Sequence, residues 1–358
     1  MKRVTLRTSL VNIPIFIGNN ILNTVDIDKY IKGKNVVIIS NTTVSKIYIK
    51  TVNKVFRNYS VSTLILPDGE KFKNITSLKK IYDFLIKNKY DRNLTIVALG
   101  GGVIGDLAAF AADTFLRGVS IVHIPTTLLA QVDSSIGGKC GINHNLGKNL
   151  IGSFKHPELV LIDSCFLKTL PTREFIAGMS EVLKYALINN NKFFGFICKH
   201  HSDISDLKKD YILETIYRCV KIKAEIVAKD EFEKGTRALL NFGHTFGHAI
   251  EACKKYKGIL HGEAVGTGMN IAAAISADLN YISDNDYCSI EESLLMLKLP
   301  TLFPKGVKVS EIIKHINHDK KKLDGKNRLI LLKAKGDGFI KEGIKTKYLE
   351  DISKNFIS

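Results

Sequence analysis

The chain of 358 residues contains no run of about twenty apolar residues, the length that a membrane-spanning helix requires. We therefore expect a protein without membrane spans. The N-terminal region has only a short apolar run, residues 11–17, and Asn12 and Pro14 interrupt it. This pattern is typical of strands, and we expect no signal peptide here.

Closely spaced cysteines are also missing. The six cysteines form no C-x-x-C pair, and most of them have apolar neighbours in the sequence. This pattern predicts buried, reduced thiols in a cytoplasmic protein. It also disfavours a structural zinc protein, because such sites are closed by four ligands that usually include cysteine.

A third absence concerns the basic residues. The net charge is +17, but the lysines are scattered, and no basic cluster is interleaved with stacking aromatic residues. Nucleic acid is therefore not the expected partner. The positive charge instead favours an anionic small molecule.

The first half of the chain alternates between strand and helix patterns. The expected strands are 35–39, 62–66, 94–99 and 121–124, and the expected helices are 44–56, 75–86 and 103–116. Continuously apolar strands are typical of a parallel sheet that is buried on both faces. Helical periodicity dominates after Pro171. We therefore predict a Rossmann-like, mostly parallel α/β domain over residues 1–170 and an all-α, or at least mainly helical, domain over residues 171–358.

A glycine-rich segment follows the third of these strands. Gly100, Gly102 and Gly105 match G-x-G-x-x-G, which lets the backbone approach a pyrophosphate at a helix N-terminus. The motif departs from the usual dinucleotide fingerprint, because it is not on the first strand and no acidic residue ends the next strand. Either it is a variant nucleotide site or the glycines pack a helix on a strand. Residues 125–149, rich in glycine, hydroxyl and amide groups, favour a loop around a polar, anionic ligand.

Three histidines form a group of possible metal ligands. His244 and His248 are four residues apart, which places them on one face of a helix, and His261 follows a basic loop. With Glu251 and Glu263 nearby, they offer the nitrogen and carboxylate ligands that zinc takes in catalytic sites. The alternative is a set of ordinary histidines satisfied by hydrogen bonds.

Two charged groups have two interpretations each. Glu181 and Lys184 share one face of a largely apolar helix, either as an ion pair in solvent or as a polar pair that points into a cleft. The lysines at 320–322 precede the strand-like segment 328–332, either as a solvated run or as a turn that closes over a phosphate.

Together these features resemble the 3-dehydroquinate synthase family. The resemblance rests on residues 100–149, the Glu181–Lys184 pair, residues 237–265 and the turn at 319–321, and it extends over nearly the whole chain in the same order. It implies the dehydroquinate synthase-like fold. The wider superfamily of sugar-phosphate cyclases shares many of these motifs, and the glycerol dehydrogenases are more distantly similar. Another sugar-phosphate cyclase or an NAD-dependent polyol dehydrogenase is therefore the alternative.

The resemblance implies an NAD- and metal-dependent carbon–oxygen lyase of the shikimate pathway, which supplies chorismate and the aromatic amino acids. The implied reaction converts 3-deoxy-D-arabino-heptulosonate 7-phosphate into 3-dehydroquinate and phosphate. Its steps are transient oxidation at carbon 5 with NAD, phosphate elimination, reduction of the same carbon, ring opening and aldol cyclisation. The implied metal is zinc or cobalt. The implied protein is a cytoplasmic homodimer that binds a sugar phosphate, and neither nucleic acid nor membrane.

The resemblance also implies a metal-ligand set that differs from the one expected from spacing. The implied zinc ligands are Glu181, His244 and His261, and His248 becomes a residue that handles a proton or lies just outside the ligand set. Three protein ligands leave open positions for two substrate hydroxyls. Cys140 stands where the family more often has threonine.

Further roles follow from the resemblance. The implied NAD-binding residues are Glu70, Lys73, Gly102, Asp106, Thr126, Thr127, Asp133, Lys139, Lys148 and Thr169. The implied catalytic residues are Lys139, Lys184, Lys223, Arg237, Asn241 and His248. The implied substrate-binding residues are Arg117, Asn149 and Lys320 or Lys321. Many of these side chains are cationic, which suits a substrate that carries a carboxylate and a phosphate.

Overall fold

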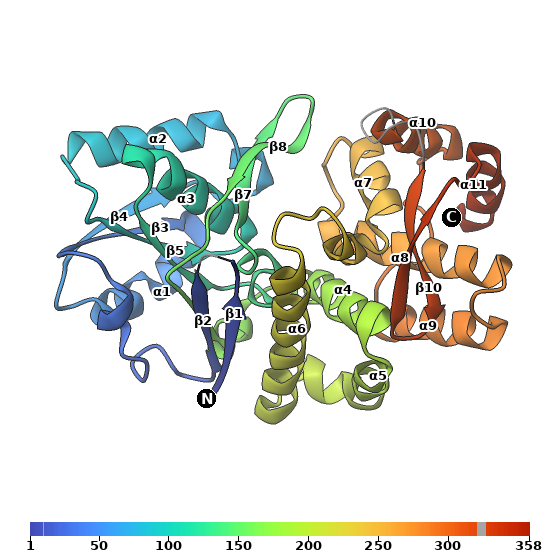
Figure 1. The fold of residues 1–358 in the computed structure, drawn as a ribbon, viewed down its shortest axis with the longest axis horizontal. Coiled ribbons are helices and arrows are strands. Elements are labelled where there is room, and N and C mark those ends of the chain that lie inside the picture. Colours follow the sequence, from blue (N-terminus) through green and yellow to red (C-terminus); the bar gives the residue numbers. More distant parts are fainter. Residues whose placement is uncertain (10, 321–326) are drawn as a thin grey trace. The chain divides into compact units, whose positions relative to one another are not determined.

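The computed structural model describes residues 1–9, 11–320 and 327–358, and only the backbone of residues 318–320 (Figure 1). It divides into two compact units. Unit 1 consists of Met1–Leu170 and Lys209–Glu231, and unit 2 consists of Pro171–Lys208 and Phe232–Ser358. Among the described residues, no helix combines the length and the apolar character needed to cross a membrane.

Unit 1 is built on a seven-stranded sheet with the order β1-β2-β9-β6-β5-β3-β4. Only β1 runs antiparallel to its neighbour, and the other pairs are parallel. The strands are β1 (Lys2–Arg7), β2 (Asn12–Gly18), β3 (Asn35–Asn41), β4 (Ser60–Leu66), β5 (Thr95–Gly100), β6 (Ser120–Pro125) and β9 (Leu159–Asp163). Every residue of β5 and β6 is buried. The parallel pairing and this burial together confirm the sheet predicted from the apolar strands.

Helices cover both faces of this sheet. Val37 and Ile39 of β3 join the core beneath α2 (Ile75–Lys87) and α3 (Gly102–Thr114), whereas Val36 and Ile38 join the core beneath α1 (Thr42–Val55). Alternate side chains of a strand point to opposite faces, so one apolar strand serves both cores. The shorter helical elements of unit 1 are η1 (Ile27–Tyr30), η2 (Glu70–Phe72), η3 (Phe115–Arg117), the π-helical turn η4 (Ala130–Ser134) and η5 (Ser164–Thr169).

Two further elements complete unit 1. Strands β7 (Lys139–His144) and β8 (Gly147–Phe154) form an antiparallel hairpin whose register shifts between Ile142 and His144. Helix α6 (Lys209–Lys229) packs against β1, and Glu214 on α6 pairs with Lys2. The domain boundary predicted at residue 170 placed α6 in the C-terminal domain. In the structure, the contacts of α6 assign this helix to unit 1.

Unit 2 is helical apart from one hairpin within its described residues. The helices are α4 (Thr172–Asn189), α5 (Asn191–Ser205), α7 (His244–Cys253), α8 (His261–Asp278), α9 (Asp284–Met296), α10 (Val309–Lys320) and α11 (Thr346–Ser353), with short turns η6 (Thr236–Asn241) and η7 (Lys354–Phe356). The hairpin pairs β10 (Arg328–Ala334) with β11 (Asp337–Glu342). Its first strand coincides with the strand-like segment 328–332.

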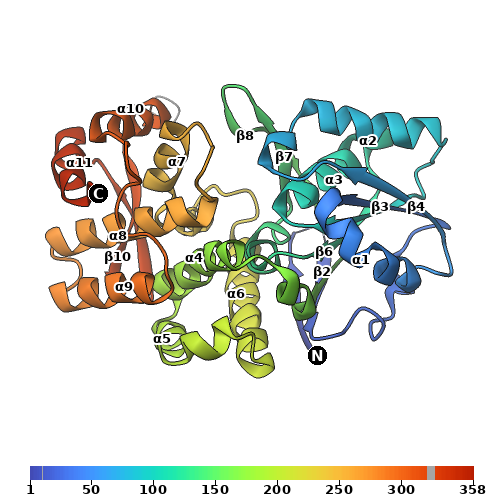
Figure 2. The ribbon, with the colours of Figure 1, turned by 180° about the vertical axis from the view of Figure 1, so that it is seen from behind.

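Helix α8 is the centre of unit 2, and it packs against α4, α7, α9 and β10 (Figure 2). Small residues make this close packing possible. A Cβ on Gly262 would collide with the backbone of Ala177 on α4, and a Cβ on Gly268 would collide with the backbone of Gly243 just before α7. Because α8 lies so close to α4 and α7, side chains from these three helices converge.

Candidate metal and active site

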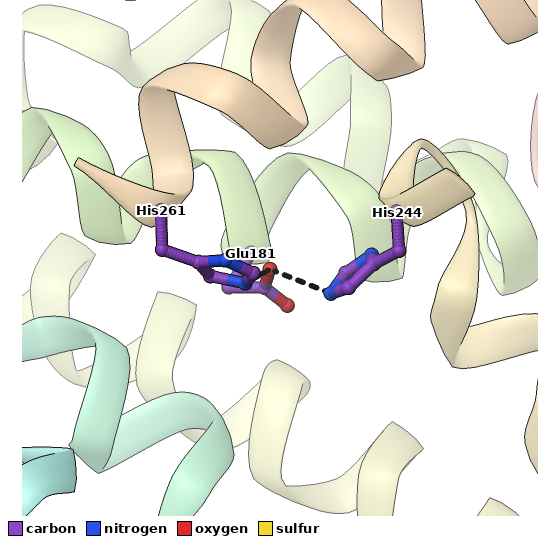
Figure 3. Close-up of side chains that lie close together, drawn as sticks. All are labelled: Glu181, His244 and His261. Atoms are coloured by element: carbon purple, nitrogen blue, oxygen red, sulfur yellow. Dashed lines mark ion pairs between the residues drawn. The ribbon is translucent and has the colours of Figure 1, made fainter. Parts of the chain in front are cut away.

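Three side chains from different helices of unit 2 converge at one point (Figure 3). Glu181 comes from the middle of α4, His244 is the first residue of α7 and His261 is the first residue of α8. The Nε2 atoms of His244 and His261 lie 3.7 Å and 3.8 Å from the same atom, Oε1 of Glu181. Both imidazoles therefore face one carboxylate oxygen.

This carboxylate oxygen is an unusual buried group. The Glu181 side chain is only 2% exposed, and its other oxygen, Oε2, accepts a hydrogen bond from Lys184. Oε1 is buried and has no hydrogen-bond partner within the described chain. Leaving a buried polar atom unsatisfied costs about 1–3 kcal/mol, and more for a charged group. A divalent ion between Oε1 and the two imidazoles would remove this cost, and one carboxylate with two imidazoles is a donor set that zinc and cobalt accept.

The other ring nitrogens of the two histidines are held by acceptors. Nδ1 of His244 lies 3.2 Å from the carbonyl oxygen of Phe242, and Nδ1 of His261 lies 3.2 Å from Oε2 of Glu251. These contacts favour a proton on each Nδ1, which leaves the Nε2 lone pairs facing Glu181. Burial lowers the pKa of His244 well below the usual imidazole value, and the charges of Lys184, His261 and His248 lower it further. A neutral imidazole is the form that binds metal.

His248 lies beside these ligands, but its environment differs from theirs. Its ring centroid is 5.3 Å from that of His244 and 5.9 Å from that of His261, and the residue is exposed. His248, Glu251 and His261 form a second group whose ligand atoms all lie within 4.8 Å of one another. Its role outside the metal-ligand set stays a prediction.

Glu263, the other carboxylate expected near the histidines from spacing, belongs to neither group. It accepts two hydrogen bonds from the Arg173 guanidinium, at 2.6 and 2.8 Å, and one from the backbone N–H of Leu260, at 2.8 Å. Arg173 also donates to the carbonyl of Gly258. Glu263 therefore holds the loop that precedes His261 and begins α8.

Further polar side chains of unit 2 are buried near α4 and η6. Lys184 is 2% exposed and bonded to Glu181, so the pair is not an ion pair in solvent. Arg237 is among the largest buried side chains of the chain. The Asn241 amide donates to Oε1 of Glu233 at 2.8 Å, a partner that the sequence did not indicate. Burying the two cations in one unit is costly unless they have partners or ligands, whereas Asn241 is only partly buried.

The glycine-rich segment joins β5 to α3 in unit 1. A Cβ on Gly100 would overlap the side chain of Ile104, so helix packing explains this glycine. A Cβ on Gly102 would lie 3.1 Å from Oγ of Ser134, at the first turn of α3. The N-cap, Gly101, has no side chain to cap the helix. A helix N-terminus without a side-chain cap offers backbone N–H groups to an anion, and the nucleotide-binding role of Gly102 stays a prediction.

Several residues that the resemblance assigns to NAD and substrate meet around Lys73. Its ammonium donates to Oδ2 of Asp106 and to Oδ1 of Asn149, each at 2.5 Å. Burial lowers the pKa of Lys73, but the carboxylates of Asp106 and Glu70 outweigh this effect and leave it raised. Asn143, which the resemblance did not single out, donates to Glu70 at 2.7 Å and accepts from the backbone N–H of Asn149 at 3.0 Å. The β7–β8 hairpin is thus tied to η2 and α3.

A second contact joins α6 to the π-helical turn η4. The Lys223 ammonium donates to the carbonyl and to Oδ1 of Asp133, at 2.7 and 2.8 Å. Thr126, which directly follows β6, has a buried hydroxyl without a hydrogen-bond partner in the described part of the chain. The Thr127 hydroxyl accepts from the N–H of Ala130 at 3.2 Å. These residues lie beside the end of β6, next to the glycine-rich segment that follows β5.

The remaining assigned residues are more scattered. Arg117 and Lys139 are exposed, and Lys148 lies 4.0 Å from Glu70. The Thr169 hydroxyl lies 2.5 Å from that of Tyr48. The side chain of Lys320 and the whole of Lys321 lie outside the described residues. Burial raises the pKa of the Cys140 thiol to about 11, so the residue beside Lys139 is a protonated thiol close to Ser153.

Comparison with known proteins points to one family. The family models "3-dehydroquinate synthase N-terminal" and "3-dehydroquinate synthase C-terminal" match residues 63–177 and 178–322. The chain is 48% identical to a 3-dehydroquinate synthase of Acinetobacter baylyi over 91% of each chain, and 43% identical to that of Ruthia magnifica over 99% of each chain. A solved structure of 2-deoxy-scyllo-inosose synthase, complexed with carbaglucose-6-phosphate, NAD+ and Co2+, superposes with a TM-score of 0.87 at 28% identity, over 99% of this chain and 100% of that one.

Proposed function

The chain belongs to the 3-dehydroquinate synthase family, and from this premise we propose the reaction and the residues that perform it. The substrate is 3-deoxy-D-arabino-heptulosonate 7-phosphate, and the products are 3-dehydroquinate and phosphate, in aromatic amino acid biosynthesis. The observation that best supports the proposal is the convergence of His244 and His261 on the buried Oε1 of Glu181, which accepts no hydrogen bond from the described residues. The enzyme is then a carbon–oxygen lyase that depends on NAD and on a divalent metal.

We propose that Glu181, His244 and His261 hold zinc or cobalt, in keeping with the Co2+ and NAD+ of the solved cyclase complex. When bound, the ion polarises a substrate hydroxyl and NAD supplies reversible oxidation of the carbon that carries it. Lys184 supports this site by its bond to Oε2 of Glu181, which leaves Oε1 directed at the imidazoles. The two Nδ1 contacts fix both rings.

The cationic residues are proposed to bind the anionic groups of the substrate. Arg237 has a planar guanidinium that matches a carboxylate or phosphate with two hydrogen bonds. Lys139, Lys223 and Arg117, with Asn149, Asn241 and Lys320 or Lys321, are proposed to share this role. A phosphate that leaves from carbon 7 carries growing negative charge, and fixed ammonium groups stabilise it. The substrate phosphate is itself proposed to accept the proton next to carbon 5.

NAD is proposed to bind unit 1, at the N-terminus of α3. The proposed contacts are Gly102 and Asp106 of α3, with Glu70, Lys73, Thr126, Thr127, Asp133, Lys139, Lys148 and Thr169. The hydrogen bonds of Lys73 to Asp106 and Asn149 hold these three side chains together. His248, exposed beside the metal ligands, is proposed to move or orient a proton at the substrate.

We also propose a homodimer in the cytoplasm. The six cysteines are free thiols, which suits a reducing compartment. Only Cys140 and Cys219 are buried, so the prediction of buried thiols was wrong for the other four. The functional division is proposed to follow the sequence, with NAD on residues 1–170 and the metal and most substrate groups on residues 171–358, apart from α6, which belongs to unit 1.

A substrate analogue tests the proposed reaction. An analogue that lacks the carbon-5 hydroxyl should bind with near-normal affinity but release no phosphate, because the neighbouring proton never becomes acidic. The true substrate should release one phosphate for each 3-dehydroquinate formed. Phosphate release from the analogue at the normal rate would exclude transient oxidation, and failure of the substrate itself to turn over would exclude the assigned reaction.

A further inference from the structure

Glu251 contacts the side of His261 that faces away from Glu181. Its Oε2 lies 3.2 Å from Nδ1 of His261, while Nε2 of the same ring lies 3.8 Å from Oε1 of Glu181. The Glu251 side chain is 2% exposed. The imidazole of His261 therefore lies between two buried carboxylates, and each ring nitrogen faces one of them.

The position of Glu251 is costly for a carboxylate. It lies in the last turn of α7, where the helix dipole favours cations and disfavours anions. It is also buried, which disfavours the ionised form unless the charge is compensated. An imidazole whose far nitrogen binds a divalent ion is a strong hydrogen-bond donor, and it would provide such compensation at Nδ1. The carboxylate is thus placed where a metal-bound His261 would stabilise it.

The two histidines that face Glu181 differ in the acceptor that lies next to Nδ1. Nδ1 of His244 faces the neutral carbonyl of Phe242, whereas Nδ1 of His261 faces a carboxylate at the same distance of 3.2 Å. A carboxylate partner raises the basicity of a histidine ligand more than a carbonyl does. His261 should therefore be the stronger of the two donors.

We propose that Glu251 is a positioning residue for the metal site. It accepts the Nδ1 proton of His261, fixes the tautomer in which the Nε2 lone pair faces Glu181, and strengthens the bond from this nitrogen to the ion. The inference rests on the proposed metal site of Glu181, His244 and His261. It adds a residue that none of the roles implied by the family resemblance included.

A different role for Glu251 would be direct ligation of the ion, together with His248 and His261. An ion at that position would leave Oε1 of Glu181 buried without a hydrogen-bond partner among the described residues. An ion at Glu181, His244 and His261 satisfies this oxygen and keeps the Nδ1 proton available to Glu251. An ion held by Glu181, His244 and His261 therefore leaves fewer polar groups unsatisfied, and Glu251 acts through His261.

The test compares Glu251→Gln with the wild-type protein and with a matched control, Glu291→Gln. Glu291 is a partly buried carboxylate of unit 2 that accepts hydrogen bonds from Asn270 and Tyr287 and, among the described residues, from no histidine. Metal-stripped proteins are titrated with Zn2+ against a chromophoric chelator, and Co2+ spectra are recorded. We expect Glu251→Gln to bind one equivalent of Zn2+ roughly 10- to 100-fold more weakly, with an altered Co2+ spectrum. Glu291→Gln should match the wild type.

Two results would overturn the inference. Wild-type zinc affinity in Glu251→Gln would show that the carboxylate does not support His261. A loss of zinc as complete as in Glu181→Gln would show that Glu251 is itself a ligand. If Glu181→Gln instead keeps wild-type affinity, the metal site proposed above fails, whatever Glu251→Gln does.

A measurement on the unmodified protein covers the case in which Glu251→Gln fails to fold. Nitrogen-15 NMR of the histidine rings in the Zn2+-bound wild-type protein reports which nitrogen of each ring carries the proton. We expect His261 to carry it on Nδ1, in a strong hydrogen bond. An Nδ1 proton of His261 that is no further downfield than that of His244 would exclude the proposed role, because the carboxylate should form the stronger hydrogen bond.

Discussion

Lys184 and Glu181 form an ion pair that is almost wholly withdrawn from water, with both side chains 2% exposed. The two residues are three positions apart on α4, the spacing at which side chains of one helix meet. Lys184 occupies only Oε2 of the carboxylate, so Oε1 stays directed at His244 and His261. The pair therefore orients the carboxylate rather than simply neutralising it.

Removing the cation of this pair should destabilise the fold strongly. Lys184→Met leaves a buried carboxylate uncompensated, and we expect a loss of about 3–5 kcal/mol in the free energy of unfolding. The measurement is urea unfolding of the metal-free protein. Lys79→Met is the matched control, because Lys79 and Asp83 form an exposed pair, 73% and 60% accessible. That control should cost less than about 0.5 kcal/mol. Equal losses in the two variants would contradict the buried role of Lys184.

The metal ligands should be separable from His248 by mutation. Glu181→Ala and His261→Ala should lose bound metal, because each removes one of three donors. His248→Ala should keep the metal and turn over slowly, since an exposed neighbour of the ligands orients a reacting group but does not hold the ion. Metal content is measured by elemental analysis and turnover by phosphate release. If His248→Ala loses metal as fully as His261→Ala, the ligand assignment is wrong.

Arg237 and Glu70 should affect different ligands. Arg237→Ala should raise the Michaelis constant of the sugar phosphate strongly and leave NAD affinity nearly unchanged, because the guanidinium is proposed to bind a substrate anion. Glu70→Ala should weaken NAD and leave substrate binding nearly unchanged. Steady-state kinetics for the substrate and fluorescence titration for NADH provide the two readouts. Similar effects of both variants on both ligands would indicate that neither role is correct.

A buried histidine in β6 should make the stability of unit 1 depend on pH. Burial lowers the pKa of His123 to about 4, whereas an unfolded histidine titrates near 6.5. Between these values the unfolded chain binds a proton that the folded chain does not, so stability falls as pH falls through this window. From pH 7 to pH 5 the loss due to this group is about 2 kcal/mol. Below pH about 4 both states are protonated, and the loss stops growing.

His123→Gln should remove this part of the pH dependence. Urea unfolding of the metal-free protein at pH 7 and pH 5 gives the difference for the wild type and the variant. The variant should lose about 2 kcal/mol less over this interval, whatever its stability at pH 7. An unchanged difference would show that His123 titrates normally in the fold.

The parallel sheet was predictable because the apolar pattern that indicates each buried strand lies within that strand's own few residues. The run 94–99 is apolar except for Thr95, a pattern that predicts burial on both faces, and β5 (Thr95–Gly100) is fully buried. The position of helix α6 could not be predicted from its local sequence pattern. Its periodicity identifies a helix but does not say which core the helix joins, and the contact between Lys223 and Asp133 joins residues that are 90 positions apart.

The candidate metal site was predictable only in part. The spacing of His244 and His248 correctly indicated one helix face, but it could not show that only His244 and His261 face Glu181. That choice depends on how closely α4, α7 and α8 approach, which Gly262 and Gly268 permit. The sequence spacing likewise indicated both Glu251 and Glu263 as carboxylates near the histidines. The fold distinguishes the two, because Glu251 contacts His261 whereas Glu263 contacts Arg173.

The most direct test of the central claim is a turnover experiment with less NAD than substrate. A cyclase of this family needs the ketone at carbon 5 only until phosphate has left, after which the same carbon is reduced again. We therefore predict that metal-loaded enzyme with substoichiometric NAD converts all the heptulosonate phosphate and releases equimolar phosphate, with no net rise in absorbance at 340 nm. Reduced cofactor that accumulates in step with substrate loss, and turnover that stops when NAD is exhausted, would contradict the cyclase and identify a dehydrogenase instead.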